Sequence, residues 1–351
     1  MKKVLPNTPL RIAAEHDACG HHDAALDALA GGTRAGDLEC MGWLGLRLLT
    51  GDRAPAYPAE GEQLLAEAAA RGNAWAANRA AAMLALGVGV PPDWPKALQW
   101  LVRAAQAGHE KSRSQLLGLA GESIAINGAR DGSSWSELAA RIDLAAWRSS
   151  PPPRVLSDDP RVSVIPDFVP PQLCEVMIHF AAGLLEPARV YDPNSGTDIV
   201  YAHRSNTVAR FGVDCVEFLH ALLQARMSAV CGAPLPHFEA PTQLHYARGE
   251  QIADHYDFVD PRVARDYADE IARNGQRVIT FIVYLNDAYQ GGETSFRKLG
   301  LSLRGSVGQG IYFVNALPDL SPDMRMIHAG EPVTHGEKWI VTQFIRSRPT
   351  R

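Results

Sequence analysis

A 36-residue recurrence in the first 145 residues constrains the fold more than any other feature. Gly36, Gly72 and Gly108 stand 36 residues apart, each after small residues in "TRAGD", "AARGN" and "AQAGH", and Gly51 and Gly87 repeat this offset. A fixed period of this length indicates stacked helix pairs, in which each pair buries its apolar face against its neighbours. Glycine suits the left-handed residue that ends a helix, so each recurring glycine is expected at a helix end.

The apolar positions of residues 10–145 have helical spacing in a background rich in alanine, leucine and arginine. The stretch "LGVGVPPDWPKALQWLVRAAQAGHEKS" resembles the short tetratricopeptide-like repeats of the Sel-one type, and the resemblance covers roughly residues 30–120. The alternative is an alanine-rich helical bundle without repeats. We predict that residues 1–150 form an all-α helical-repeat domain.

Three consecutive prolines at 151–153 interrupt the helical pattern, because proline cannot continue a helix and favours an extended connector. Beyond them, four stretches with period-two patterns read as strands: "RVSVIPDFV", "RVITFIVYLND", "GIYFVNAL" and "KWIVTQFIRS". Between these stretches, "PPQLCEVMIHFAAGLL" and "VEFLHALLQARMSAVCG" read as helices, the second ending at Gly232. We predict a second domain, residues 151–351, with two antiparallel sheets and helices packed on the outer side.

Composition and charge exclude several classes of protein. The net charge of −5 gives no basic field, so neither nucleic acid nor an anionic membrane is an expected partner. The five cysteines are odd in number and scattered, which argues against a disulfide framework and for a reducing, cytoplasmic location. We expect no signal peptide, because prolines and an arginine interrupt the apolar residues of the N-terminus. We also expect no membrane span, because no apolar run approaches the required length.

The stretch "DHYDF" places His255 and Asp257 two residues apart. This spacing alone is weak, since His21 and Asp23 show it too, in a helical region where such positions diverge around the helix. In an extended segment, however, residues i and i+2 point to the same face. An imidazole and a carboxylate suit ferrous iron, provided that one more histidine joins them.

Two downstream residues complete a candidate site. His328 opens "HAGEPVTHGEKW", and Lys338 follows ten residues later at the start of a predicted strand. His335 lies seven residues after His328 and is the alternative third ligand. The turn-rich connection "YLNDAYQGGETSF" separates the two halves of the pattern.

Five stretches together resemble the prolyl 4-hydroxylase branch of the 2-oxoglutarate- and iron(II)-dependent dioxygenases. In chain order they are "PRVSVIPDFVPPQLCEVMI", "HRSNTVARF", "LHYARGEQIADHYDF", "FIVYLNDAYQGGETSF" and "IHAGEPVTHGEKW". The resemblance implies a double-stranded β-helix (jelly-roll) barrel with supporting helices. It implies an iron site formed by His255, Asp257 and His328, and it assigns the far carboxylate of 2-oxoglutarate to Lys338.

The resemblance also concerns the surroundings of the site. It suggests that Tyr246, Tyr284 or both donate hydroxyls towards 2-oxoglutarate, although either could be a plain core aromatic. Two positions depart from the family pattern: Phe344 stands where a second tryptophan is frequent, and Ile252 stands where an aromatic residue is common. Both positions lie near the substrate side in relatives, so the departures put peptidyl-proline in doubt as the substrate. The charged segment 258–277 is either a mobile lid or a solvated insertion.

The reaction implied by the resemblance is hydroxylation of a C–H bond, coupled to conversion of 2-oxoglutarate and dioxygen into succinate and carbon dioxide, with ascorbate as an optional reductant. We expect the substrate to be a prolyl or other side chain of a polypeptide, recruited by the concave surface of the helical repeats. The alternatives are a free amino acid or small natural product as substrate, a cupin-type isomerase or hydrolase, and a non-catalytic protein whose repeats mediate interactions. The sequence does not indicate an oligomeric state.

Overall fold

The computed structural model describes residues 8–124, 132–192, 197–199, 204–262 and 265–350. The chain divides into two compact units. Unit 1 contains Met1–Ala120, Ala125–Leu144 and Val213–Leu222, and unit 2 contains Gly121–Ile124, Ala145–Gly212 and Leu223–Arg351. The segment Val213–Leu222, far beyond the proline run, thus belongs to unit 1. A domain boundary at residue 150 stays a prediction.

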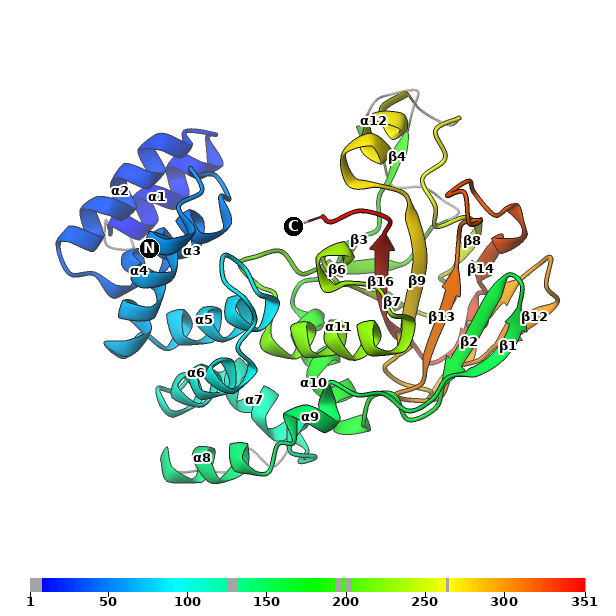
Figure 1. The fold of residues 1–351 in the computed structure, drawn as a ribbon, viewed down its shortest axis with the longest axis horizontal. Helices are drawn as coiled ribbons and strands as arrows, with labels where there is room; N and C mark the ends of the chain where they lie inside the picture. The colour runs from blue at the N-terminus through cyan, green and yellow to red at the C-terminus, as the bar shows by residue number, and fades with distance from the viewer. Residues whose placement is uncertain (1–7, 125–131, 193–196, 200–203, 263–264, 351) are drawn as a thin grey trace, which may run out of the picture. The chain divides into compact units, whose positions relative to one another are not determined.

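Unit 1 is built from antiparallel helices. Its helices are α1 (Pro9–Ala18), α2 (His22–Arg34), α3 (Leu38–Thr50), α4 (Pro58–Ala70), α5 (Ala74–Leu86), α6 (Trp94–Gln106), α7 (Glu110–Leu119) and α8 (Gly132–Ala140), drawn in blue to green in Figure 1. The helices α2, α4 and α6 begin 36 residues apart, as do α3, α5 and α7. Gly36, Gly72 and Gly108 follow α2, α4 and α6 with φ of 87°, 98° and 94°. The predicted helix-pair repeat is therefore confirmed, with its glycines at helix ends.

Small residues let α3 and α4 approach closely. A Cβ on Gly45 would lie 2.7 Å from the backbone nitrogen of Leu65, and a Cβ on Gly61 would collide with the backbone nitrogen of Leu49. Contacts this short leave no space for a methyl group, and the clashing atoms are backbone atoms that cannot rotate away. Glycine at these two positions fixes the distance between the two helices.

The small sheet and the large sheet of unit 2 are both antiparallel. The large sheet consists, in spatial order, of β1 (Arg154–Asp158), β2 (Arg161–Ile165), β13 (Gly310–Val314), β9 (Arg277–Tyr284), β16 (Lys338–Arg346), β7 (Thr242–Tyr246), β6 (Thr207–Arg210) and β3 (Glu186–Pro187). The small sheet consists of β12 (Leu301–Leu303), β11 (Thr294–Phe296), β14 (His328–Gly330) and β8 (Ile252–His255). Two-stranded ladders join β10 (Gln290–Gly291) to β15 (Val333–His335) and β4 (Val190–Asp192) to β5 (Thr197–Ile199). The four strands predicted from period-two patterns are confirmed as β2, β9, β13 and β16.

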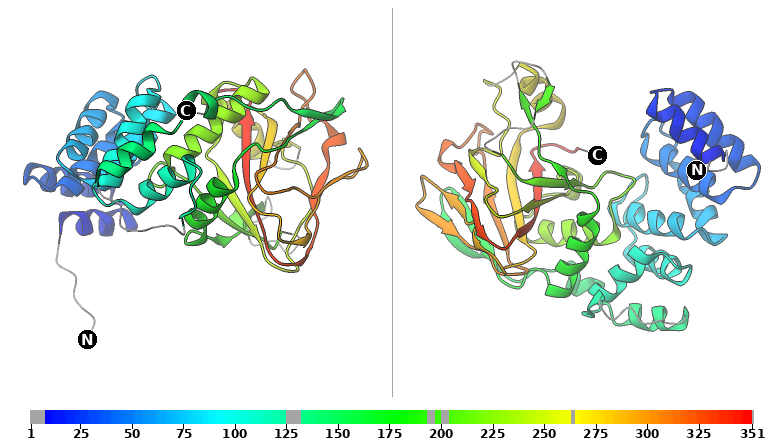
Figure 2. Two further views of the ribbon diagram at one scale, coloured as in Figure 1. Left: turned by 90° about the horizontal axis from the view of Figure 1, so that it is seen from below. Right: turned by 180° about the vertical axis from the view of Figure 1, so that it is seen from behind.

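The core of unit 2 lies between the two sheets, which face each other (Figures 1 and 2). The ring of Phe296 on β11 meets the ring of Phe313 on β13 edge to face, with centroids 4.9 Å apart. The predicted helices are α10 (Pro171–Ala182) and α11 (Phe218–Cys231), and α11 is followed by Gly232 at φ 72°. On the outer side of the large sheet, Gln224 of α11 donates to the side chain of Gln343 on β16 at 2.8 Å. The predicted double-stranded β-helix with outer helices is confirmed.

The charged segment 258–277 contains α12 (Arg265–Asn274), and residues 263–264 fall outside the described part of the chain. Its ends are tied together, because the side-chain amide of Gln276 both accepts from the Val259 nitrogen and donates to the Val259 oxygen, each at 2.8 Å. Arg346 donates to the Gly275 carbonyl at 2.8 Å. The lid and the solvated insertion both remain consistent with this arrangement.

Among the residues that the structure describes, no helix has the length and apolar character needed to cross a membrane.

The close approach of α3 and α4 leaves no space for an added side-chain atom at Gly61. Replacing Gly61 with alanine should destabilise the protein by about 1–3 kcal/mol, because the added methyl group forces the two helix backbones apart. Gly31→Ala in α2 is the matched control, since a Cβ there meets only the end of the Arg34 side chain at 3.9 Å. That control should be neutral or stabilising by up to about 1 kcal/mol, as expected for a helical glycine in open space. Thermal and denaturant unfolding of both variants measures the difference, and equal stability of the two would contradict the prediction.

Candidate functional site

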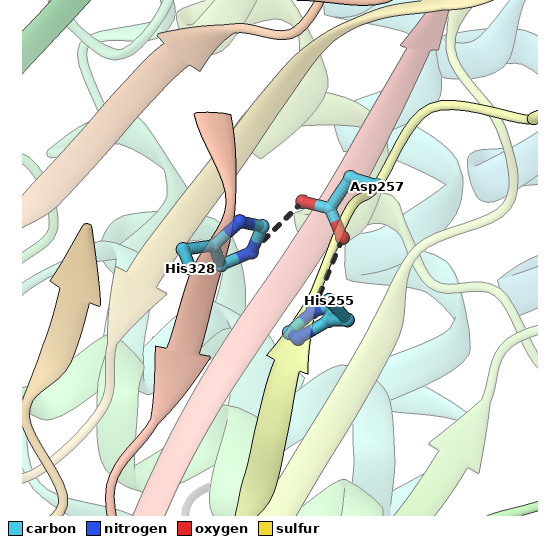
Figure 3. A group of neighbouring side chains, drawn as sticks. All are labelled: His255, Asp257 and His328. Carbon is cyan, nitrogen blue, oxygen red and sulfur yellow. Dashed lines mark ion pairs between the residues drawn. The ribbon is translucent and has the colours of Figure 1, made fainter. Parts of the chain in front are cut away.

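Strand pairing brings the two candidate histidines together. His255 is the last residue of β8 and His328 the first of β14, and the two residues are directly opposite in the antiparallel ladder. Asp257 lies two residues beyond His255 and turns back towards both rings (Figure 3). One ligand atom from each of the three residues lies within 4.8 Å of the others. The sequence predicted this grouping, and its members come from segments about 70 residues apart.

Hydrogen bonds to the backbone orient both rings. The Nδ1 of His255 lies 2.8 Å from the Ala253 carbonyl, and the Nδ1 of His328 lies 3.0 Å from the Met326 carbonyl. A carbonyl oxygen only accepts, so each Nδ1 must carry the proton. Each Nε2 faces the Asp257 carboxylate, at 3.5 Å from His255 and 3.4 Å from His328 (Figure 3).

This arrangement requires a positive charge. In the neutral rings, each Nε2 is a lone-pair acceptor that faces another acceptor, so a proton on a ring or a cation between the groups must offset the repulsion. Burial disfavours charge on His328, yet the adjacent Asp257 carboxylate raises the pKa of this histidine above its usual value. Burial opposes ionisation of Asp257 as well, but the two histidines hold its pKa well below the usual range.

The donor set fits ferrous iron. Two imidazoles and one carboxylate on one side of an ion leave its other coordination positions open, which is the arrangement of non-haem iron oxygenases. Asp257 and His328 are buried, whereas the side chain of His255 is 33% exposed, so the group has one open side. The Nδ1–carbonyl bonds leave the lone pair of each Nε2 available to a metal ion.

Two buried polar residues hold Asp257 in place. The Thr280 hydroxyl donates to Asp257 Oδ2 at 2.7 Å, and the Asn315 amide donates to the same hydroxyl at 2.8 Å. Thr280 and Asn315 are both fully buried. Neighbours of this kind restrict the orientation of a ligating carboxylate.

Lys338 is a buried cation among aromatic rings. It pairs with Tyr246 in the ladder between β16 and β7, and its Nζ lies 5.1 Å from the Tyr246 ring centroid and 5.5 Å from that of Tyr284. Its Nζ donates to the Gly292 carbonyl at 2.7 Å. Burial lowers the pKa of Lys338 to about 8, although the nearby Glu293 carboxylate acts in the opposite direction.

No carboxylate pairs with Lys338 within 4 Å among the described residues. A buried ammonium group without a counter-ion is costly, so the surroundings of Lys338 favour an anion.

The Tyr284 hydroxyl donates to Thr294 Oγ1 at 2.8 Å, while the buried Tyr289 hydroxyl has no hydrogen-bond partner in the described part of the chain. Burial raises the pKa of Tyr284 to about 12 and also raises that of Tyr246, so both phenols stay protonated as donors at neutral pH.

The structure also places the other residues that the sequence analysis singled out. His335 is exposed on β15 and lies outside the metal-binding group. Ile252 is buried in the core, and Phe344 carries the Arg277 guanidinium 3.9 Å above its ring. His203, the first residue of the stretch "HRSNTVARF", lies outside the described residues.

The sequence analysis gave no role to several polar residues near the site: Arg204, Thr280, Tyr289, Thr294 and Asn315. Arg204 pairs with Ile252 through an isolated β-bridge, and its buried Nε has no partner in the described residues. Tyr289 and Thr294 flank the paired glycines of "YQGGET". This glycine-rich turn is the sequence feature that could have indicated these two residues. Thr280 and Asn315 lie in strand-like apolar stretches that read as core, so nothing distinguished them in the sequence.

Comparisons with known proteins match the second half of the chain. Residues 242–346 match the model of the 2OG-Fe(II) oxygenase superfamily. Probable prolyl 4-hydroxylase 10 of Arabidopsis thaliana is 30% identical over 215 residues, which cover 55% of this chain and 71% of the relative. Prolyl 4-hydroxylase 13 of the same plant is 26% identical over 222 residues, covering 59% of this chain and 78% of the relative.

Solved structures also resemble parts of the chain. The viral collagen prolyl hydroxylase vCPH from Paramecium Bursaria Chlorella virus-1, in complex with 2OG, is 26% identical with a TM-score of 0.39, covering 53% of this chain and 96% of its own. A Sel1 repeat protein from Oxalobacter formigenes is 21% identical with a TM-score of 0.30, covering 37% and 55%. The sequence relationship to the Arabidopsis protein is the decisive one, since it extends over 71% of that relative at 30% identity. The chain therefore belongs to the 2OG-Fe(II) oxygenase superfamily, as a prolyl 4-hydroxylase-like dioxygenase that depends on 2-oxoglutarate and iron(II).

Proposed function

We propose that His255, Asp257 and His328 bind the ferrous iron and that the enzyme hydroxylates a prolyl side chain of a polypeptide. The observation that carries the metal assignment is the pair of oriented imidazoles whose Nε2 atoms face one buried carboxylate. Prolyl 4-hydroxylases among the relatives support the substrate class. The alternative substrate is a free amino acid or a small natural product, since Phe344 and Ile252 depart from the family pattern.

The other polar groups of the site are assigned to 2-oxoglutarate. We assign the far carboxylate of this cosubstrate to the Lys338 ammonium, because a charge-assisted bond in a buried site is strong. Tyr246 and Tyr284 lie beside Lys338, and we assign them to hydroxyl donation towards the same molecule. When bound, ferrous iron and 2-oxoglutarate supply the dioxygen chemistry, while the protein supplies orientation and exclusion of water. Ascorbate is proposed only as a reductant that sustains turnover.

The cysteines support a reducing, cytoplasmic location, which stays a prediction. Cys19, Cys40, Cys174 and Cys231 carry free thiols. Burial raises the pKa of the Cys174 thiol to about 12 and that of Cys40 to about 11, so these two thiols stay protonated and unreactive.

Substitution of the proposed ligands tests the metal site. His255→Ala and His328→Ala should each abolish iron-dependent succinate production and weaken metal binding in a titration. Both variants should stay folded, because the ladders between strands, rather than the ion, hold the sheets together. His335→Ala is the matched control, since this histidine is exposed on β15 and should leave binding and turnover unchanged. Full turnover in either ligand variant would overturn the assignment.

Substitution of Lys338 tests the cosubstrate site. Lys338→Ala should weaken 2-oxoglutarate binding by about 2–4 kcal/mol while iron binding changes little, as expected when one partner of a buried charge pair is removed. Lys298→Ala, at an exposed position, is the control. In the wild type, the affinity should fall as the pH rises above about 8, because Lys338 then loses its proton, by up to about tenfold per pH unit. Calorimetry between pH 7 and 10 measures this dependence, and an unchanged affinity over that range contradicts the assignment.

Mass spectrometry tests the substrate class. A proline-containing peptide incubated with enzyme, iron(II) and 2-oxoglutarate should gain the mass of one oxygen atom on proline, and fragmentation should locate it. The His328→Ala variant is the control for background oxidation. Modification of free proline or another small molecule, with all peptides unmodified, would favour the alternative substrate class.

Recruitment of a polypeptide by the helical repeats is tested best by point variants of the full chain. Trp43 on α3 and Trp75 on α5 stack at a centroid distance of 4.4 Å and stay partly exposed. Replacing both with alanine should raise the KM for a peptide substrate several-fold, while succinate production without peptide stays the same. An unchanged KM would favour repeats that only stabilise the protein or mediate dimerisation.

A further inference from the structure

Unit 1 contains a buried polar cluster that the proposed reaction does not use. Its members are Asn78 and Arg79 on α5, Ser112 and Gln115 on α7, and Glu217 in the segment Val213–Leu222. Each is at most 1% exposed. Polar groups this deeply buried are retained only where they satisfy one another or a ligand.

The cluster converges on one carboxylate. The Arg79 guanidinium lies 2.9 Å from Glu217 Oε1, and the amides of Asn78 and Gln115 donate to Glu217 Oε2 at 2.8 and 3.0 Å. Lys111 of α7 lies 3.7 Å from Oε1. Both carboxylate oxygens are therefore satisfied by side chains of the repeats.

The repeat period explains why these side chains meet. Arg79 and Gln115 are 36 residues apart and occupy equivalent positions of α5 and α7 in successive repeats. The equivalent position of α3 is Trp43, which also lies 36 residues before Arg79. One helix face thus recurs along unit 1, with an aromatic residue in α3 and polar residues in α5 and α7.

The same side chains also hold the backbone on both sides of Glu217. Arg79 donates to the Val216 carbonyl at 2.6 Å, and the Gln115 side-chain oxygen accepts from the Leu219 nitrogen at 3.0 Å. The Phe218 ring meets Trp94 of α6 edge to face, with centroids 6.0 Å apart. Four consecutive residues, 216–219, are thereby held through backbone, carboxylate and aromatic contacts.

We propose that this recurring face of α5 and α7 is a polypeptide-binding surface whose ligand is the chain's own segment Val216–Leu219. Its specificity is for a carboxylate followed by an aromatic residue, flanked by backbone groups that Arg79 and Gln115 recognise. The polypeptide bound by these two repeats is then internal and permanently present. A separate polypeptide substrate would then bind the part of unit 1 that carries Trp43 and Trp75.

Hydrogen exchange in the full chain tests the proposal. Glu217→Gln and Arg79→Met should each speed the exchange of the backbone amides of residues 217–222 by at least tenfold, because a buried charge loses its partner and the segment loosens locally. The double variant should exchange no faster than the single variants, since both remove the same interaction. Glu110→Gln, which breaks only the exposed Arg113–Glu110 pair on α7, is the matched control and should change nothing.

Gln115→Ala provides a milder probe that retains the ion pair between Arg79 and Glu217, and it should speed exchange at Leu219 several-fold. Two outcomes would overturn the proposal. One is unchanged exchange of residues 217–222 in all of these variants. The other is acceleration that is equally large in strands β9 and β16, because the substitutions would then act through global unfolding and not through a bound segment.

Discussion

The candidate metal site depends on the register between β8 and β14. This pairing sets His255 directly opposite His328, and their Nδ1–carbonyl bonds turn both Nε2 atoms towards Asp257. Side chains alternate between the two faces of a strand, so a slip of one residue would move one histidine to the opposite face. Two short strands and the bend that follows β8 thus bring the three candidate ligands together.

A second register, in the large sheet, places the cation. Lys338 lies opposite Tyr246 on β7, while Ile340, two residues further along β16, lies opposite Tyr284 on β9. Lys338 and both tyrosines therefore face the interior between the sheets, where Phe313 contacts His328 at a centroid distance of 5.0 Å. The buried Asp257 carboxylate lies two residues beyond β8 of the small sheet, and the buried Lys338 ammonium lies on β16 of the large sheet. This polarity matches a molecule that binds a metal at one end and carries a carboxylate at the other.

The site residues that the sequence indicated differ in kind from the site residues that only the structure revealed. His255, Asp257, His328 and Lys338 stand in short motifs with fixed spacing, so the sequence indicated them without knowledge of the strand pairs. Thr280 and Asn315 act through the geometry of neighbouring strands and carry no local signal in apolar stretches. The helix-pair repeat was predictable because a period is visible within the sequence itself. The inclusion of Val213–Leu222 in the helical unit was not predictable, since the contact between Arg79 and Glu217 spans more than 130 residues.

That inclusion has an evolutionary consequence. A helix that begins among the repeats and continues beyond them makes the two parts of this chain poor candidates for free recombination. A chain with a different segment at 213–222 would lose the acceptor for Arg79, and a repeat array without counterparts of Asn78 and Gln115 would leave Glu217 without two of its donors. Substitutions at positions 78, 79, 115 and 217 are therefore expected to change together among related chains, as coupled positions of a single inherited module.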